Sequence, residues 1–349
     1  MMGSPLAREL CAIYAALIAY ATLYPLTSWR DPGLSPFSWA ASWPTALHLG
    51  DFTFNLVGYV PLGMLAVWAV FPRLRGVAAM VFALLTGTAL SFVLESSQTY
   101  LPTRFPSIAD LAANSLGTLA GAILGAVFAP MLLERGVLKT LGDRWFGVST
   151  PRALILAILW LFASLYPQSM LFGHGSAVSL IGPMSGYPCT PVEFARVEAA
   201  VTAASLFAAG ALLASCVKPL APRLLLLVLF VLAGCGVRAL SHAILFAPDQ
   251  AFAWATPGAL RGLMWGSAAL AISVALPRAM QLTLAAIAVT FATVVVNFAP
   301  ANPYYAAVVK TLNPGLFLNF NGLTQTISAL WPFAAAVYVI FSLARGERR

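Results

Sequence analysis

The sequence predicts an all-α protein, a polytopic transmembrane helical bundle of about ten helices with both termini in the cytoplasm. Composition provides the first observation: 60% of the 349 residues are hydrophobic and 9% are charged, whereas about 25% of a soluble domain is charged. The second is a mean hydropathy of +0.87. The third is the recurrence of apolar stretches of about 20 residues, the length that an α-helix needs to cross a bilayer. Together these observations exclude an ordinary soluble domain.

The formal net charge of +8 indicates membrane topology rather than nucleic-acid binding. The Lys and Arg residues form no basic patch with interleaved aromatic residues, which is the usual signature of a nucleic-acid surface. If the N-terminus lies inside, most of them fall at the cytoplasmic ends of the apolar stretches, as the positive-inside rule requires. We therefore expect no nucleic-acid partner and place both termini in the cytoplasm.

Four apolar stretches predict a first transmembrane domain, residues 1–130. They cover residues 9–26, 51–71, 76–95 and 110–128, each to within a few positions. The loop after the first stretch carries Trp29, Trp39 and Trp43, whose indole rings favour a membrane interface. The charged residues that follow the fourth stretch predict a cytoplasmic connecting loop, residues 131–152.

Six further apolar stretches predict a second transmembrane domain, residues 153–349. They cover residues 153–172, 193–216, 222–246, 257–276, 279–298 and 326–344, again to within a few positions. The chain has 4 cysteines, and their positions give no framework of disulfide bonds.

Polar side chains are concentrated at the predicted outer ends of three helices in the first domain. They form three pairs with helical spacing: Asp51 with Asn55, Glu95 with Gln98, and Asp110 with Asn114. Because residues three or four apart share one face of a helix, each pair can point into the bundle. Arg104 and Ser107 lie in the connection between two of these helices. The eight residues are our candidates for a ligand-binding, outward-facing polar pocket.

Two interpretations of this cluster remain open. Ionisable side chains are costly in hydrocarbon and normally face the bundle interior or a water-filled cavity, so Arg104 is expected to compensate one of the acids. In a functional site, Glu95 or Asp110 is the candidate catalytic base. In a structural role, Asp110 caps a helix and the amide side chains join helices. The small-residue spacing of Gly117 and Gly121 predicts close packing against another helix.

The second domain has its own polar candidates within apolar segments: Glu193, Glu198, Arg238 and His242. Arg238 and His242 are four residues apart and therefore share a helix face. A buried arginine requires a counter-charge, and the two glutamates are the nearest acids by topology. The histidines show no metal-ligand spacing, so we expect no metal and no cofactor.

The polar pattern of the first domain resembles that of the VanZ-like family over roughly residues 20–130. The matching positions are Asp51-x-x-x-Asn55, Pro61-Leu62-Gly63, Glu95-x-x-Gln98, Arg104, and Ser107-x-x-Asp110-x-x-x-Asn114-x-x-Gly117. The resemblance implies a multi-pass protein of the bacterial cytoplasmic (inner) membrane, linked to the cell envelope and to low-level teicoplanin resistance. It implies no reaction, because the mechanism of the family is not established.

These observations favour a non-enzymatic protein that binds or helps to move an amphiphile. Expected partners are membrane lipids and a lipid-linked cell-wall or polysaccharide intermediate, or a glycopeptide. One alternative is an intramembrane enzyme that modifies a lipid-linked substrate, with Arg104 holding its phosphate. Another is a secondary transporter, which the two halves favour and the outer position of the polar cluster disfavours.

Overall fold

The computed structural model describes residues 5–24, 26–41, 43, 49–134, 145, 150–177, 190–218, 220–246, 248–299 and 318–344. Regular structure in these ranges is helical, with ten α-helices that correspond one to one with the ten predicted stretches. Eight of the described helices are long and apolar enough to cross a membrane. The predicted bundle of about ten helices is therefore confirmed. Most of the predicted connecting loop, at 135–144 and 146–149, lies outside the described residues.

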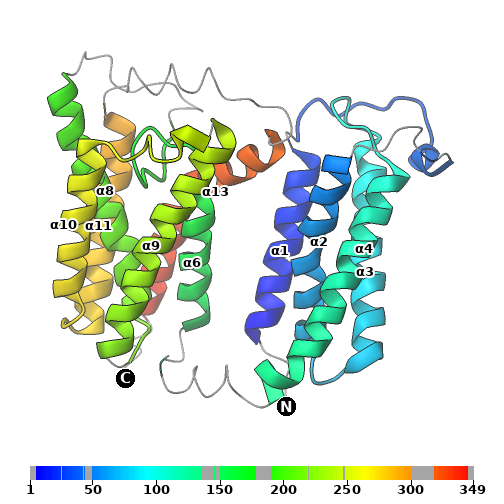
Figure 1. The fold of residues 1–349 in the computed structure, drawn as a ribbon, viewed down its shortest axis with the longest axis horizontal. Coiled ribbons are helices and arrows are strands. Elements are labelled where there is room, and N and C mark those ends of the chain that lie inside the picture. The colour runs from blue at the N-terminus through cyan, green and yellow to red at the C-terminus, as the bar shows by residue number, and fades with distance from the viewer. Residues whose placement is uncertain are drawn as a thin grey trace. The chain divides into compact units, whose positions relative to one another are not determined.

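The helices fall into two groups along the chain (Figure 1). The first group comprises α1 (Pro5–Leu23), α2 (Leu49–Val70), α3 (Gly76–Gln98) and α4 (Ile108–Ala129), with a short 3-10 turn η1 (Ser38–Ala41) and a π turn η2 (Pro130–Glu134). The second comprises α6 (Thr150–Ala163), α8 (Pro191–Ala214), α9 (Leu220–Leu245), η3 (Pro248–Gln250), α10 (Pro257–Ser273), α11 (Arg278–Phe298) and α13 (Leu318–Ala344).

Contacts divide the chain into two compact units. The first unit is Met1–Leu141 with Leu316–Leu323, and the second is Gly142–Gly315 with Thr324–Arg349. The first residues of α13 thus belong to the first unit and the remainder of that helix to the second.

In the first unit, α2 and α4 pack at very short range because glycine lies at their crossing. A Cβ atom on Gly117 would lie 2.0 Å from the carbonyl oxygen of Leu56, and one on Gly121 would lie 1.9 Å from that of Val60. Only a residue without a side chain permits this approach. The close packing predicted for these glycines is therefore confirmed.

The outer face of α3 is apolar and exposed. Val77, Val81 and Leu85 are 69%, 48% and 65% exposed, and their spacing of four residues places them on one side of the helix. Ala79 and Ala83, which point inward, are fully buried against α2 and α4 residues. This arrangement is expected of a helix with one face toward lipid and one toward the bundle.

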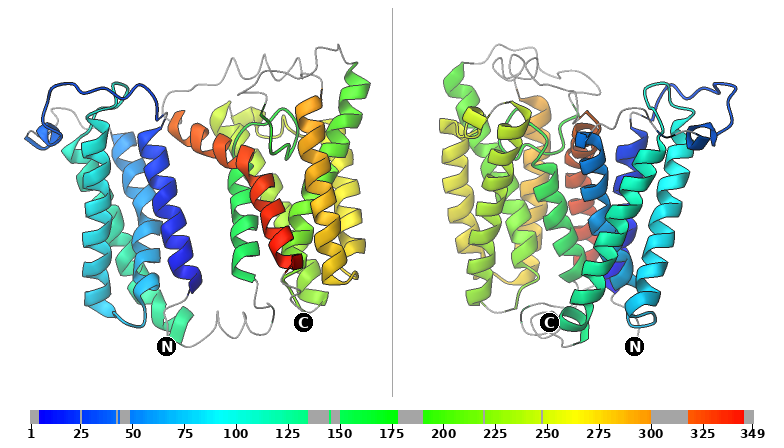
Figure 2. Two further views of the ribbon diagram at one scale, coloured as in Figure 1. Left: turned by 180° about the vertical axis from the view of Figure 1, so that it is seen from behind. Right: turned by 45° about the vertical axis from the view of Figure 1, so that its right-hand side comes forward.

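In the second unit, α8 is the central helix. Within its apolar span, 72% of the residues are buried, and α10 and α11 pack along it (Figure 2). The contact with α10 again depends on small residues, since a Cβ on Gly262 would lie 2.7 Å from the carbonyl oxygen of Ala199. The aromatic core beside it contains Trp160, Phe172 and Phe230.

The first helix of the second unit is shorter than predicted. We expected a helix over residues 153–172, but α6 ends at Ala163 and residues 164–177 are non-helical. The apolar pattern continues past the end of the helix because this segment is buried inside the unit, where Phe172 is fully covered. Pro167 and the positive φ angles of Phe172 (57°) and Gly175 (83°) are incompatible with a continuing helix.

Candidate functional site

Polar side chains of the first unit meet in one layer near the ends of its helices. We call this group the polar layer: Asn55 and Tyr59 of α2, Ser91 and Glu95 of α3, and Ser107, Asp110 and Asn114 at the start of α4. The layer lies where α3 ends and α2 and α4 begin, and five of the eight predicted residues belong to it.

Asn55 and Asp110 join α2 to α4. The side-chain Nδ2 of Asn55 donates to Asp110 Oδ1 over 2.7 Å. Asp110 lies in the first turn of α4, where a carboxylate is stabilised by the helix dipole. The residue that caps this helix is Ser107, whose hydroxyl accepts from the backbone N–H of Ala109. Asp110 therefore does not serve as the N-cap, which leaves its carboxylate for the contact with α2.

Glu95 joins the end of α3 to the start of α4. Its side chain is 3% exposed, and Oε2 accepts from the backbone N–H of Ser107 at 3.0 Å. Ser107 is the N-cap of α4 and Asp110 lies in the first turn of that helix, so Glu95 reaches the same end of α4 as Asp110. Two acids from neighbouring helices thus share one buried polar region.

Asn114, Ser91 and Tyr59 extend the layer deeper into the bundle. Asn114 Nδ2 donates to Ser91 Oγ over 2.9 Å, and the buried Tyr59 interacts with Ser91. The Oδ1 atom of Asn114 is buried and has no hydrogen-bond partner among the described residues. Sequence reasoning missed Tyr59 and Ser91, although each is four positions from a predicted residue, Asn55 and Glu95 respectively.

Three predicted residues lie at the edge of the layer. Gln98 Nε2 donates to the carbonyl oxygen of Thr22 at 3.0 Å, and the Arg104 guanidinium donates to that of Tyr24. Both therefore bind the C-terminal end of α1, and burial lowers the pKa of Arg104. Asp51 is exposed and interacts electrostatically with Asp110.

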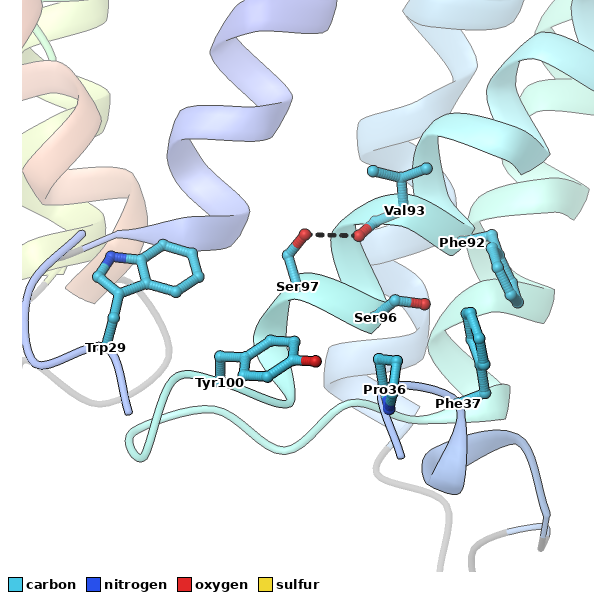
Figure 3. A pocket seen from close by; sticks show the side chains of 8 residues that line it. All are labelled: Trp29, Pro36, Phe37, Phe92, Val93, Ser96, Ser97 and Tyr100. Atoms are coloured by element: carbon cyan, nitrogen blue, oxygen red, sulfur yellow. Dashed lines mark hydrogen bonds between the residues drawn. The ribbon is translucent and has the colours of Figure 1, made fainter. Parts of the chain in front are cut away.

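A pocket of about 390 Å³ lies on another face of α3 (Figure 3). We call it the α3 groove. It is lined by Trp29, Pro36 and Phe37 from the loop after α1, and by Phe92, Val93, Ser96, Ser97 and Tyr100 from the last turns of α3 and the residues after it. None of the eight predicted site residues lines this groove.

The predicted polar residues of the second unit have separate contacts. Glu193 is exposed and forms a capping box with Thr190 at the start of α8. Glu198 Oε2 accepts from Thr256 Oγ1 at 2.5 Å, at the start of α10. Arg238 donates to the carbonyl oxygens of Ser164, Tyr166 and Gln168. Both ring nitrogens of His242 are buried without a partner among the described residues.

Arg238 thus binds the non-helical segment 164–177, whose other polar atoms are held by a network that the sequence did not reveal. Gln168 Nε2 donates to His174 Nδ1 at 2.8 Å and to Ser328 Oγ at 2.9 Å. Asn297 Nδ2 donates to the carbonyl oxygen of Gly175 at 2.8 Å. Burial and the charge of Arg238 lower the pKa of His174 to about 3.

The polar layer is chemically suited to hydrogen bonding with a polar group. Carboxylate, amide and hydroxyl side chains within one layer can accept from and donate to sugars, amides or phosphate esters. No group of three or more potential metal-binding side chains occurs in the part of the chain that the structure describes. The arrangement offers acids for proton transfer as well, but Glu95 and Asp110 each already accept a hydrogen bond within the protein.

Comparison with known proteins gives one family match. Residues 11–129 match the family model described as VanZ/LLP1. The matched range contains α2, α3 and α4 and most of α1, and therefore the whole polar layer. No curated protein and no solved structure matches the chain.

Proposed function

Because residues 11–129 match the VanZ-like family in a chain with membrane-spanning helices, we propose that this protein binds an amphiphilic molecule of the bacterial cell envelope at the polar layer. The ligand is a lipid-linked cell-wall or polysaccharide intermediate, or a glycopeptide such as teicoplanin. The protein lies in the bacterial cytoplasmic membrane, with the polar layer near the outer surface. This orientation follows the distribution of basic residues.

One observation carries the proposal: the buried Glu95 and the half-buried Asp110 both lie in the polar layer, where Glu95 accepts from the Ser107 backbone N–H three residues before Asp110. Two nearby carboxyl groups in a poorly solvated region are costly to keep for structure alone. A ligand that donates hydroxyl, amide or amine hydrogens would offset this cost. Envelope precursors and glycopeptides carry many such donors beside an apolar portion.

Binding is favoured over catalysis by the contacts of the acids. Glu95 accepts from the Ser107 backbone and Asp110 accepts from Asn55, so both carboxylates are already engaged in contacts within the protein. In the enzyme alternative, Glu95 or Asp110 is the general base and Arg104 binds the phosphate of the substrate.

A secondary transporter is the other alternative, and one feature favours it. The helix α6 stops at Ala163 and is followed by the buried non-helical segment 164–177. Discontinuous helices of this kind form the binding sites of many transporters. On this alternative the second unit carries the substrate, and the polar layer is structural.

The test is mass spectrometry of molecules that co-purify with the full chain from its bacterial host. We expect an envelope precursor to be enriched with the wild type and lost from Glu95→Gln and Asp110→Asn. Glu9→Gln, which changes an exposed acid of α1, serves as the matched control and should retain the ligand. Thermal unfolding in detergent must show that all variants are folded.

Three outcomes would contradict the proposal. Identical profiles for the wild type and the two variants, with stability reduced, would assign the acids to structure. A time-dependent conversion of the precursor by purified protein would replace binding with catalysis, and gradient-dependent uptake into proteoliposomes would favour the transporter.

A further inference from the structure

The α3 groove has the composition of a lipid-binding site at a membrane interface. Its rim carries Trp29 and Tyr100, residue types that concentrate at the level of lipid headgroups. Its floor carries Phe92 and Val93, and the ring of Phe92 stacks on Phe37 with 5.5 Å between centroids. The volume of about 390 Å³ falls within the range of small-molecule sites, roughly 300–1,000 Å³.

The groove is continuous with a surface that contacts lipid. Val93 is 58% exposed, and Phe82, which is 38% exposed, lies eleven residues earlier on the same face of α3. An apolar chain that lies along this face from the middle of the membrane therefore reaches the groove at Val93. A hydrocarbon tail of a membrane lipid has the shape and the chemistry for this path.

Ser96 adds a polar group at a defined depth. Its hydroxyl oxygen is buried and has no hydrogen-bond partner within the described part of the chain, although Ser96 lines the groove. A buried hydroxyl without a hydrogen-bond partner is energetically unfavourable. Because serine χ1 has three staggered positions, one rotation brings the hydroxyl to a ligand. The neighbouring Ser97 already donates to the carbonyl oxygen of Val93 at 2.8 Å (Figure 3).

We propose that the α3 groove binds one acyl chain of a membrane glycerolipid, and that Ser96 donates to its ester carbonyl oxygen. In a bilayer the ester carbonyls lie just below the headgroups. Ser96 lies at a corresponding depth, one helical turn below Tyr100, whose residue type is typical of the headgroup level. Val93 and Leu85 lie further along α3, toward the hydrocarbon. This site goes beyond the proposed function, since none of the polar-layer residues lines it.

The experiment compares two photoactivatable lipids in vesicles of phosphatidylethanolamine and phosphatidylglycerol containing the full chain. One probe is a phosphatidylethanolamine with ester-linked chains and a diazirine on one chain, and the other is its ether-linked analogue, which lacks the carbonyl. Labelled peptides are mapped by mass spectrometry at increasing probe fractions. A specific site saturates, whereas the general lipid shell is labelled in proportion to the probe fraction.

We expect saturable labelling of residues 92–100 in the wild type, with the ester probe preferred about five-fold, as one hydrogen bond of about 1 kcal/mol provides. Ser96→Ala should bind both probes equally. Ser97→Ala removes a hydroxyl from the same helix turn and should keep the preference.

A second pair of variants tests occupancy of the groove itself. Val93→Trp fills the groove and should abolish saturable labelling, while Leu85→Trp adds the same bulk two turns away and should not. Labelling proportional to the probe fraction, equal labelling by both probes in the wild type, or equal effects of Ser96→Ala and Ser97→Ala would overturn the proposal. Glu95→Gln should leave groove labelling unchanged, so the two ligand sites are tested separately.

Discussion

The side chain of Asn55 donates to the carboxylate of Asp110 over 2.7 Å and connects the second helix of the first unit to the fourth. The two residues are 55 positions apart in sequence, yet they belong to helices that also meet through the glycine contacts of Gly117 and Gly121. A specific polar contact and a specific steric contact thus fix the same helix pair.

The first prediction concerns the energy of this hydrogen bond. Asn55→Ala and Asp110→Ala should each destabilise the first unit, and the double variant should lose less than the sum. The expected coupling energy is about 1–2 kcal/mol, because the acceptor is a carboxylate and the interaction lies between packed helices. SDS-induced unfolding of the four proteins in a double-mutant cycle measures it. Additive losses would show that the two side chains do not interact.

The second prediction separates two glycines with different surroundings. Gly121→Ala should destabilise the protein by about 2–3 kcal/mol, since the new Cβ would lie 1.9 Å from the carbonyl oxygen of Val60. Gly58→Ala is the matched control on α2. Within the described residues, no atom outside the neighbouring backbone of α2 lies within 4 Å of its new Cβ, so the substitution should stabilise the helix by about 0.5–1 kcal/mol. Unfolding in mixed micelles compares them, and equal effects would contradict the close crossing.

The third prediction tests the role of Arg238. Its guanidinium binds the carbonyl oxygens of Ser164, Tyr166 and Gln168, and Arg238→Met leaves them buried without this donor. We expect a loss of about 3 kcal/mol or more. Arg238→Lys should restore only part of it, because lysine lacks the planar fork.

The rate of alkylation of the buried Cys216 thiol reports opening of the second unit in these variants. Arg261→Met changes an exposed arginine of α10 and should leave that rate nearly unchanged. If the alkylation rate of Arg238→Met also equals that of the wild type, the Arg238 guanidinium does not stabilise the segment 164–177.

The fourth prediction is a pH dependence of the second unit. Burial lowers the pKa of His174 from 6.5 to about 3, so between these values the unfolded chain binds a proton that the folded chain does not. Above pH 6.5 the protonation of His174 does not affect the free energy of unfolding. As the pH decreases from 6.5 toward 3, the free energy of unfolding falls by about 1.4 kcal/mol per pH unit.

SDS unfolding of the wild type and of His174→Gln between pH 4 and pH 7.5 checks this prediction, because this range covers most of the interval between the unfolded and folded pKa values of His174. The difference in unfolding free energy between the two proteins should change with pH in the stated direction. A difference that is constant with pH would show that His174 is not held in its neutral form.

Local sequence patterns were sufficient to predict the helices and several residues of the polar layer. Asn55 and Glu95 were identified because a polar or charged residue within an apolar segment stands out in the sequence. Helical spacing then placed each of them on one helix face with a second polar residue. Tyr59 and Ser91 were missed because tyrosine and serine are common in apolar segments and carry no charge. Spacing of four from a predicted residue was the signal that could have found them.

The non-helical segment of the second unit could not be predicted from local sequence. Its residues are as apolar as those of a helix, and hydropathy records burial without distinguishing the backbone conformation. What supports this conformation is distant in sequence: Ser328 binds Gln168 from 160 positions away, and Asn297 binds Gly175 from 122 positions away. Such partners are known only once the helices are placed.

The dependence of segment 164–177 on distant residues affects when this segment can fold during synthesis of the chain. The helix α6 has 14 residues and is about 21 Å long, shorter than the roughly 30 Å of hydrocarbon. The segment after it contains carbonyl groups that need Arg238, Asn297 and the residues near Ser328. It therefore cannot reach its final conformation as it leaves the ribosome. We expect its final conformation to be stabilised only after the helix that carries Ser328 has been translated.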